Sequence, residues 1–494
     1  MISSVFNSLV FKNRSLILIS LFILNFVLKI LFLSTQDICI DEPYSIFHSQ
    51  FGVEDIIRFL KPTNNPPLFE IILHYWIKVF GISAFSVRFL PLLFGSLAVI
   101  FIFRISEKLF SYQVGIASSL LYTFSTISIY YSHDCRVYTL FLLLTTISVY
   151  FFIKLFEGSS SFWDKLFFCA CNLLIIYAHY FGFIVWFIEV TYVLIYGRKY
   201  FMRFAVLLGI SIVFYLPQIL IFLERFKQSS SEGTWIKELV TIENLYNRLW
   251  SFCNMPVVVV LCLAILVAAG VKKASSKLLK KENSEDGSNT NKKINLIGIW
   301  FFVPYVLMFV ISFKVPIYLE RYLIFIAPAF YILVCSLVNY LFDNKNLRNV
   351  AFFVLILSFA ITLQLNPDKK RESSKVIDYV KQNKDSETLV IICAHDFINN
   401  FAFYYDKKIF QNVIPGIEYE TLNKSLNSEN VFPVRTINEI NSDILKKFRK
   451  IIYLDAAADF SNPGNGILQA LENNYKLNTK KHFNTIFDVY IFVS

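Results

Sequence analysis

Two adjacent carboxylates, Asp41 and Glu42, follow the first long apolar run of the chain, within the stretch Asp37–Tyr44. Ionisable side chains at membrane depth are costly to desolvate, so they tend to face a cavity where they bind charge or transfer protons. A plainer interpretation is that the pair caps the next helix, because acidic residues favour helix N-termini. On these two residues alone, both interpretations stay open.

Further polar clusters stand at the ends of later apolar runs. They supply carboxylates, guanidinium groups and imidazoles, which are the groups needed to move protons and to bind anions. The clusters are Tyr131–Tyr138, His179-Tyr180 and Tyr318–Tyr322. Together with Asp41 and Glu42 they form one site only if all of them lie on the same side of a membrane.

The composition is that of a polytopic membrane protein. Of 494 residues, 56% are hydrophobic and 53 are Phe, which is far more apolar than a soluble domain. The first apolar run, 15–33, is long enough to span a bilayer and has no small-residue cleavage site after it. It is interpreted as a retained signal anchor.

Apolar runs predict about eleven transmembrane helices. Their ranges are 15–34, 87–106, 113–131, 136–156, 165–180, 182–197, 203–223, 255–271, 294–313, 322–342 and 348–366. Lys and Arg gather in alternate loops, which the positive-inside rule assigns to the cytoplasm. The N-terminus is then cytoplasmic, the chain after about residue 366 is extracytoplasmic, and the polar clusters share the extracytoplasmic side.

The net charge of +11 does not indicate a nucleic-acid partner. The excess of Lys and Arg belongs to the membrane-spanning part, where short basic loops beside spans account for it. The eight cysteines show no CxxC pair and no metal-ligand spacing. A disulfide between Cys39 and Cys135, both expected on the extracytoplasmic side, stays open.

Two domains are predicted: a transmembrane module, 1–366, and a soluble extracytoplasmic α/β domain, 367–494. The first outer loop, 35–86, is expected to carry helices on the membrane surface at 53–60 and 68–80. The polar segment at about 272–293 is expected to be a disordered cytoplasmic loop.

In the C-terminal domain, a helix at 374–382 and strands at 388–393, 450–454 and 489–493 favour a parallel sheet. Neither a GxGxxG nor a P-loop pattern is present, so no nucleotide is assigned to this domain.

The ordered set of motifs resembles the GT-C membrane glycosyltransferases of the protein-mannosyltransferase and ArnT type. The similarity covers most of residues 10–370, and the C-terminal domain matches only in its placement. The matching segments are Asp41-Glu42, Asn64–Phe69, Trp76, Phe80-Gly81, Val87–Pro91, Tyr131–Tyr138, His179-Tyr180 and Glu320–Tyr322.

The resemblance implies an inverting transferase in the inner (plasma) membrane, acting at its outer face. The donor would be a monosaccharide on a polyprenyl phosphate, undecaprenyl phosphate in a bacterium. The acceptor would be a lipid, a glycan or a protein.

The same resemblance implies roles for individual residues. Asp41 is expected to take the proton of the acceptor hydroxyl, and Asp134 to orient the acceptor or hold Arg136. Arg136 and Arg321 are expected to bind the leaving phosphate, because guanidinium groups bind phosphate bidentately. The remaining substrate-binding candidates are Glu42, Tyr44, Asn65, Arg88, His133, Tyr138, His179, Tyr180, Glu320 and Tyr322.

A divalent cation is the one cofactor left open, with Glu42, Asp134 and His179 as candidate ligands. Some relatives carry His or Glu directly before the Pro-Pro-Leu segment, where this chain has Asn65. An amide is a weak ligand for a transition metal and an adequate one for a hard cation. A histidine at the end of a span, such as His133 or His179, is also an ordinary interfacial hydrogen-bonding residue.

Two other functions stay open. A transporter or flippase of lipid-linked sugars would share the spans and the cations, but such proteins commonly show inverted repeats and helices broken near mid-membrane. This chain has only 15 Gly, no evident repeat, and charges at span ends. A glycan ligase or polymerase with a diphosphate-linked donor is expected to depend on outer-loop arginines more than on an aspartate.

Overall fold

The computed structural model describes residues 2–156, 160–232, 240–278, 285–440, 442–460, 462–483 and 486–493. The chain divides into two compact units. The helical unit comprises Met1–Leu33, Phe59–Phe69 and Arg88–Pro367. The sheet unit comprises Ser34–Arg58, Glu70–Val87 and Asp368–Ser494.

This division differs from the predicted one in the first outer loop. The C-terminal boundary lies at Asp368, beside the predicted 367, but most of the loop belongs to the sheet unit and not to the membrane module. The reason is a set of contacts between residues far apart in sequence. For example, the Ile38 N–H donates to the Tyr404 hydroxyl at 2.7 Å, across 366 positions.

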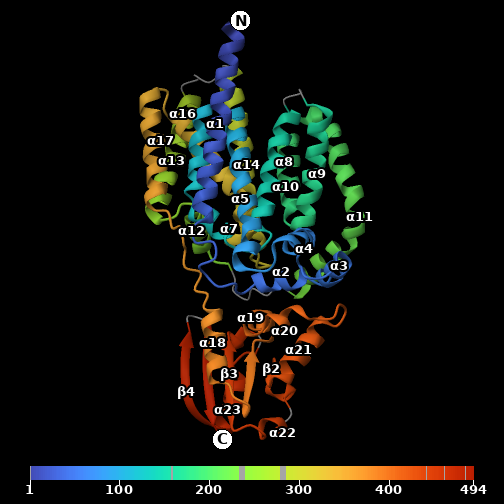
Figure 1. Cartoon of the computed structure of the whole chain (residues 1–494). Coiled ribbons are helices and arrows are strands. Elements are labelled where there is room, and N and C mark those ends of the chain that lie inside the picture. Colours follow the sequence, from blue (N-terminus) through green and yellow to red (C-terminus); the bar gives the residue numbers. More distant parts are fainter. Residues whose placement is uncertain are drawn as a thin grey trace. The chain divides into compact units, whose positions relative to one another are not determined.

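The helical unit consists mainly of long apolar helices, with shorter helices and 3₁₀ turns between them (Figure 1). In chain order they are α1 (Ile2–Ile30), α5 (Ala84–Leu109), α6 (Tyr112–Thr123), α7 (Thr126–Ser132), α8 (Tyr138–Phe156), α9 (Phe162–Ala178), α10 (Gly182–Tyr196), η1 (Arg198–Tyr200), α11 (Phe201–Glu232), α12 (Ile242–Ser251), α13 (Pro256–Leu278), α14 (Glu285–Ile311), α15 (Glu320–Leu323), η2 (Ile324–Ile326), α16 (Ala327–Leu341) and α17 (Lys345–Ile361).

Among the described residues, six helical stretches are long and apolar enough to cross a membrane. They are Ala84–Leu109, Tyr138–Phe156, Arg198–Ser231, Pro256–Ser275, Asn289–Ile311 and Glu320–Leu341. The polytopic helical class is therefore confirmed, while the number of eleven spans stays a prediction.

Two predicted spans are interrupted. The span at 113–131 breaks into α6 and α7 because Ser125 caps α7 and its hydroxyl accepts from the Ser128 N–H at 3.4 Å. The span at 322–342 contains the 3₁₀ turn η2, and Pro328 stands in the first turn of α16, where its missing N–H costs nothing.

The segment predicted to be disordered, 272–293, is helical wherever the structure describes it. Helix α13 continues to Leu278 and α14 begins at Glu285. Residues such as Ala274 and Lys277 are good helix formers and extend an existing helix, so no new nucleation is required. Residues 279–284 lie outside the described part of the chain.

The sheet unit holds a five-stranded sheet in the order β2-β1-β3-β5-β4. The strands are β1 (Thr388–Cys393), β2 (Val431–Pro433), β3 (Lys450–Ala456), β4 (Lys476–Phe483) and β5 (Phe487–Val493). Strand β1 runs parallel to β3, as predicted, and β2, which was not predicted, runs parallel to β1. The third predicted strand, β5, was expected in the same parallel sheet but pairs antiparallel with β3 and β4. The sheet is mixed because the short connection from β4 to β5 permits only a hairpin.

The helices of the sheet unit come from both parts of the sequence. They are α2 (Glu42–His48), α3 (Val53–Leu60), α4 (Leu68–Phe80), α18 (Ser373–Asn383), η3 (His395–Phe397), α19 (Ile398–Tyr405), α20 (Lys407–Gln411), α21 (Glu418–Ser428), η4 (Ile437–Glu439), α22 (Ser442–Leu445), η5 (Ala458–Phe460) and α23 (Gly466–Asn474). Helices α3 and α4 have the predicted bounds. Helix α2 packs against α19, and its Phe47 ring lies 5.5 Å from that of Phe410.

Candidate functional site

The predicted site residues divide between the two units. Asp41, Glu42 and Tyr44 belong to the sheet unit. The others belong to the helical unit, namely Asn65, Arg88, His133, Asp134, Arg136, Tyr138, His179, Tyr180, Glu320, Arg321 and Tyr322.

The connection between α7 and α8 positions two buried charges in the helical unit. Helix α7 ends at Ser132 and α8 begins at Tyr138, and between them the Arg136 N–H donates to the Asp134 carbonyl at 2.7 Å. Asp134 and Arg136 are 7% and 6% exposed. Because buried charge is costly in a membrane protein, its presence at this turn marks a candidate site.

The imidazole of His179 is the meeting point of two of the polar clusters. It follows the last residue of α9 and is acted on electrostatically by the guanidinium groups of Arg136 and Arg321. Its Nδ1 accepts from the Phe181 N–H at 3.2 Å, so Nε2 carries the proton of the neutral ring. Arg136 and Arg321 are the groups of this cluster that suit a phosphate, because guanidinium groups bind phosphate bidentately.

Aromatic rings join the same residues. The Tyr322 ring lies 5.6 Å from the ring of His179 and 6.5 Å from that of Tyr138. The Arg321 guanidinium lies over the Tyr322 ring at 5.4 Å. Tyr138 in turn contacts Tyr131 at 5.5 Å between ring centroids. The result is a continuous aromatic surface beside the two guanidinium groups.

The carboxylates of Asp134 and Glu320 both act electrostatically on the Tyr131 phenol. Glu320 is also paired with Arg248 of α12, with 3.7 Å between Oε1 and Nη1. The clusters at 131–138, 179–180 and 318–322 therefore lie together in the helical unit. The roles assigned to their members stay predictions.

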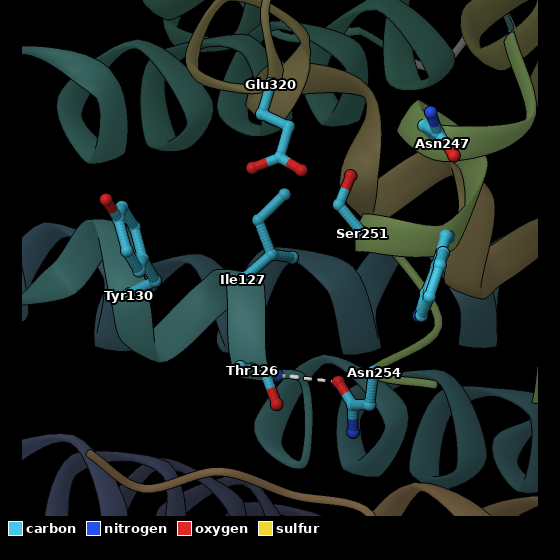
Figure 2. Close-up of a pocket in the computed structure, with 8 residues that line it drawn as sticks. Thr126, Ile127, Tyr130, Asn247, Ser251, Asn254 and Glu320 are labelled. Atoms are coloured by element: carbon cyan, nitrogen blue, oxygen red, sulfur yellow. Dashed lines mark hydrogen bonds between the residues drawn. The ribbon is translucent and has the colours of Figure 1, made fainter. Parts of the chain in front are cut away.

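A cavity of about 350 Å³ adjoins this group of residues. Figure 2 shows the Glu320 carboxylate pointing into it, with Tyr130 and Ile127 of α7 and Asn247 and Ser251 of α12 around it. It is lined by Thr126, Ile127, Tyr130, Asn247, Trp250, Ser251, Asn254 and Glu320.

One edge of the cavity is fixed by a single amide. Asn254 accepts from the Thr126 N–H at 2.7 Å and donates to the Phe124 carbonyl at 2.8 Å. The sequence analysis did not predict this cavity. Trp250 and Asn247 lie close together in a polar stretch between two predicted spans, and this pattern could have indicated a binding site there.

Two of the predicted binding residues tie helices together. The His133 Nε2 is 2.6 Å from the carbonyl of Lys29 near the end of α1. The Arg88 Nη1 donates to the Leu33 carbonyl at 3.3 Å, just beyond that end. These bonds fix the exit of α1 against α7 and α5, which supports the interfacial interpretation of His133.

Lys29 itself was missed, because it lies inside the first predicted span and its neighbours are apolar. It is fully buried, and its Nζ donates to the Gly95 carbonyl at 2.9 Å and to the Tyr122 hydroxyl at 3.2 Å.

The last two predicted residues of this unit have local contacts. Asn65 donates its N–H to the Thr63 hydroxyl at 3.2 Å, within the turn that precedes α4. Tyr180 packs its ring against Phe222 of α11 at 5.3 Å.

In the sheet unit, the two first-loop carboxylates have different surroundings. Glu42 is fully buried, and its Oε2 accepts from Arg371 Nη1 at 2.5 Å and from the Cys39 N–H at 3.4 Å. Asp41 is half-buried at the N-cap position of α2, but its side chain makes no capping hydrogen bond. The Asp41 side chain therefore does not act as the hydrogen-bonding cap of α2. The Tyr44 ring lies against that of His48 at a tilt of 52°, with ring centroids 4.2 Å apart.

The candidate metal ligands do not fit a cation site. Among the described residues, no group of three or more His, Cys, Asp or Glu side chains is arranged to hold a metal ion. Glu42 is already neutralised by Arg371, and the guanidinium groups around His179 would repel a dication. No step of the mechanism is therefore assigned to a metal. The described part of the chain includes all eight cysteines, and they form no disulfide, so the open pairing of Cys39 with Cys135 is not realised.

Comparison with known proteins agrees with the motif resemblance. A family model described as dolichyl-phosphate-mannose-protein mannosyltransferase matches residues 64–222. A search of curated proteins finds no match.

Solved structures are similar over almost the whole chain. ArnT from Cupriavidus metallidurans bound to undecaprenyl phosphate has a TM-score of 0.61 at 13% identity, covering 97% of this chain and 98% of that one. Its apo state has a TM-score of 0.59 at 11% identity, covering 99% and 98%. The Archaeoglobus fulgidus oligosaccharyltransferase in complex with zinc and sulfate has a TM-score of 0.52 at 12% identity, covering 95% and 72%. The fold is thus the GT-C fold that the sequence motifs predicted.

Proposed function

We propose that this protein is a glycosyltransferase that moves a monosaccharide from a polyprenyl phosphate carrier to a hydroxyl group of its acceptor. The observation that carries the proposal is the pair of guanidinium groups, Arg136 and Arg321, beside the buried His179 in a chain with the GT-C fold. The similar ArnT structure was solved with undecaprenyl phosphate, which is the type of carrier proposed here.

The phosphate of the donor is the proposed ligand of Arg136 and Arg321. As the anomeric C–O bond breaks, the bridging oxygen leaves with the electron pair and the polyprenyl phosphate gains negative charge. Guanidinium groups already in place stabilise that charge without reorganisation. Because phosphate is a good leaving group, no general acid is required. The aromatic surface of Tyr138 and Tyr322 supports the sugar or the first isoprene unit.

The proposed base is Asp41. It takes the proton of the acceptor hydroxyl while the new C–O bond forms at the anomeric carbon, opposite the leaving phosphate. A single displacement of this kind inverts the anomeric configuration. The match of Asp41-Glu42 to the motif of the family supports this role, and Asp41 is only half-buried, so part of its side chain is accessible.

The cavity at Glu320 is the proposed site of the acceptor. An indole ring, a phenol ring, amides and a carboxylate are the groups that recognise sugar hydroxyls and the flat faces of pyranose rings. This lining favours an acceptor that carries a glycan, whether it is a glycolipid, a wall polymer or a glycosylated protein.

The reaction is proposed to occur at the extracytoplasmic face of the inner (plasma) membrane. The alternation of basic loops supports this orientation, with the N-terminus in the cytoplasm and the sheet unit outside.

The decisive experiment uses the full-length protein in nanodiscs with a radiolabelled polyprenyl-phosphate sugar and a glycolipid acceptor. Wild-type protein is expected to transfer the label with inversion, which NMR of the product detects. Asp41→Asn is expected to abolish transfer and to leave donor binding and folding intact. Full turnover by Asp41→Asn would rule out this base. Movement of the label across a proteoliposome membrane without any transfer would favour a flippase instead.

A further inference from the structure

We infer that the sheet unit sets the conformation of the segment that carries Asp41, and that Arg371 is the positioning residue. This segment, residues 36–42, is called the acid loop. The inference deepens the proposed function and rests on it, because it concerns the loop that carries the proposed base. It assigns a positioning task to the C-terminal part of the chain, which no sequence motif indicated.

The start of the acid loop is bound by the segment that leads into α18. Gln36 accepts from the Lys369 N–H at 2.9 Å through its side-chain oxygen. Asp37 accepts from Ser374 twice, from its N–H at 2.8 Å and from its hydroxyl at 2.7 Å. Ser374 lies in the first turn of α18, so Asp37 satisfies one of the free N–H groups there and binds the acid loop to that turn.

The middle of the loop is bound by α19. The Ile38 N–H donates to the Tyr404 hydroxyl at 2.7 Å, and Asn400 Nδ2 donates to the Ile40 carbonyl at 3.1 Å. Ile40 has φ of +59°, a left-handed conformation that a β-branched residue rarely adopts. A strained backbone conformation of this kind persists only where surrounding residues stabilise it. Ile40 is the residue directly before Asp41. Asn400, which is 3% exposed, is one of the groups that hold it.

The end of the loop is bound by an ion pair. Arg371 and Glu42 are both buried, with side chains 6% and 0% exposed, and 2.5 Å separates Nη1 from Oε2. Removal of one partner from such a pair leaves an uncompensated charge in a dry environment. Glu42 begins α2 and adjoins Asp41 in the chain, so a shift of Glu42 moves the proposed base.

The reactivity of Cys39 is a probe of whether the acid loop is held in its native conformation. It is fully buried, and the Ser373 hydroxyl donates to its Sγ at 2.9 Å. Burial raises the pKa of the Cys39 thiol, so the thiol stays protonated and poorly reactive while the loop is held. Release of the loop exposes the thiol to solvent and to alkylating reagents.

The test compares Arg371→Gln with Arg449→Gln in the full-length protein. Arg449 is a suitable control because it lies in the same unit but pairs with Glu387 at the surface, with side chains 82% and 59% exposed. Two quantities are measured: the steady-state constants of transfer, and the rate at which N-ethylmaleimide alkylates Cys39, followed by peptide mass spectrometry.

Arg371→Gln is expected to lower kcat by about a hundredfold with little change in the KM for the donor, because small displacements of a reacting group have effects of this size. Alkylation of Cys39 is expected to accelerate by at least about tenfold. Arg371→Lys keeps the charge but loses the planar fork, so it is expected to restore part of kcat. Arg449→Gln should match the wild type in both measurements.

Protected Cys39 and unchanged kcat in Arg371→Gln would overturn the inference. If Arg371→Gln does not fold, the double variant Glu42→Gln/Arg371→Gln removes both buried charges and is expected to fold but to stay slow. Full turnover by that double variant would show a purely structural role and would also overturn the inference. Alkylation of Cys39 does not depend on sugar transfer. It therefore tests the positioning role of Arg371 even if the proposed reaction is wrong.

Discussion

The Lys29 Nζ donates to the Gly95 carbonyl at 2.9 Å inside the helical unit and so joins α1 to α5 where the two helices are closely packed. A Cβ atom at Gly95 would lie 2.5 Å from the Ser132 hydroxyl oxygen and 3.0 Å from Lys29 Nζ. The glycine therefore permits the close approach of α1, α5 and α7, and the last of these leads into the turn with Asp134 and Arg136.

Substitution Gly95→Ala is expected to destabilise the protein by about 1–3 kcal/mol, since the added methyl group overpacks this contact. Thermal unfolding in detergent, followed by tryptophan fluorescence, measures the effect. Gly298→Ala in α14 is the matched control, because a Cβ there meets no atom within 4 Å and alanine favours a helix. Equal melting temperatures for the two variants would contradict the tight packing at Gly95.

Substitutions Arg136→Gln and Arg321→Gln are each expected to weaken donor binding by about 2 kcal/mol, or roughly thirtyfold, through loss of a charge-assisted hydrogen bond to phosphate. Isothermal titration with polyprenyl phosphate tests this directly. Arg198→Gln serves as the control, since its Nε donates to the Leu194 carbonyl at the end of α10. Unchanged affinity in both test variants would show that Arg136 and Arg321 do not bind the phosphate of the donor.

Substitution Trp250→Ala is expected to raise the KM for the acceptor about fivefold, because an aromatic contact contributes roughly 1 kcal/mol, and to leave the KM for the donor unchanged. Initial rates at varied acceptor concentration provide the measurement. Trp163→Ala in α9 is the control, as Trp163 is 63% exposed and lines no part of the cavity. A rise in the donor KM instead would place the donor, not the acceptor, at Glu320.

Protease added to sealed right-side-out vesicles is expected to digest the sheet unit, whereas inside-out vesicles should protect it. An antibody against a C-terminal tag detects the digestion on a blot. A cytoplasmic tag at residue 281, in the basic segment between α13 and α14, should give the opposite pattern. Digestion of both tags in one vesicle type would mean that the predicted orientation is wrong.

Local signals in the sequence predicted much of the fold. Helices α3 and α4 have the predicted bounds because their apolar residues recur at helical spacing, and β1 is a continuous buried run between polar flanks. The clusters around His179 were found because charged residues at span ends stand out against an apolar chain. The strand β4 was missed because it is mostly exposed and polar.

Features that depend on contacts between residues far apart in the sequence could not be predicted. Arg371 and Glu42 are 329 positions apart, and nothing in either neighbourhood indicates the other. Glu320 and Trp250 border one cavity only because α12 folds back beside α15. The strained backbone at Ile40 is likewise invisible in the sequence, since an isoleucine there predicts extended structure.

The sheet unit is assembled from three stretches of polypeptide, of which the last leaves the ribosome only after the bundle helices. Residues 36–42 are therefore synthesised long before the residues that bind them. A chain that ends before residue 371 lacks Arg371, Ser373, Asn400 and Tyr404, so its acid loop has none of these partners. If Arg371 positions the proposed base as inferred, a chain truncated in this way is expected to be inactive even when its helices are in the bilayer.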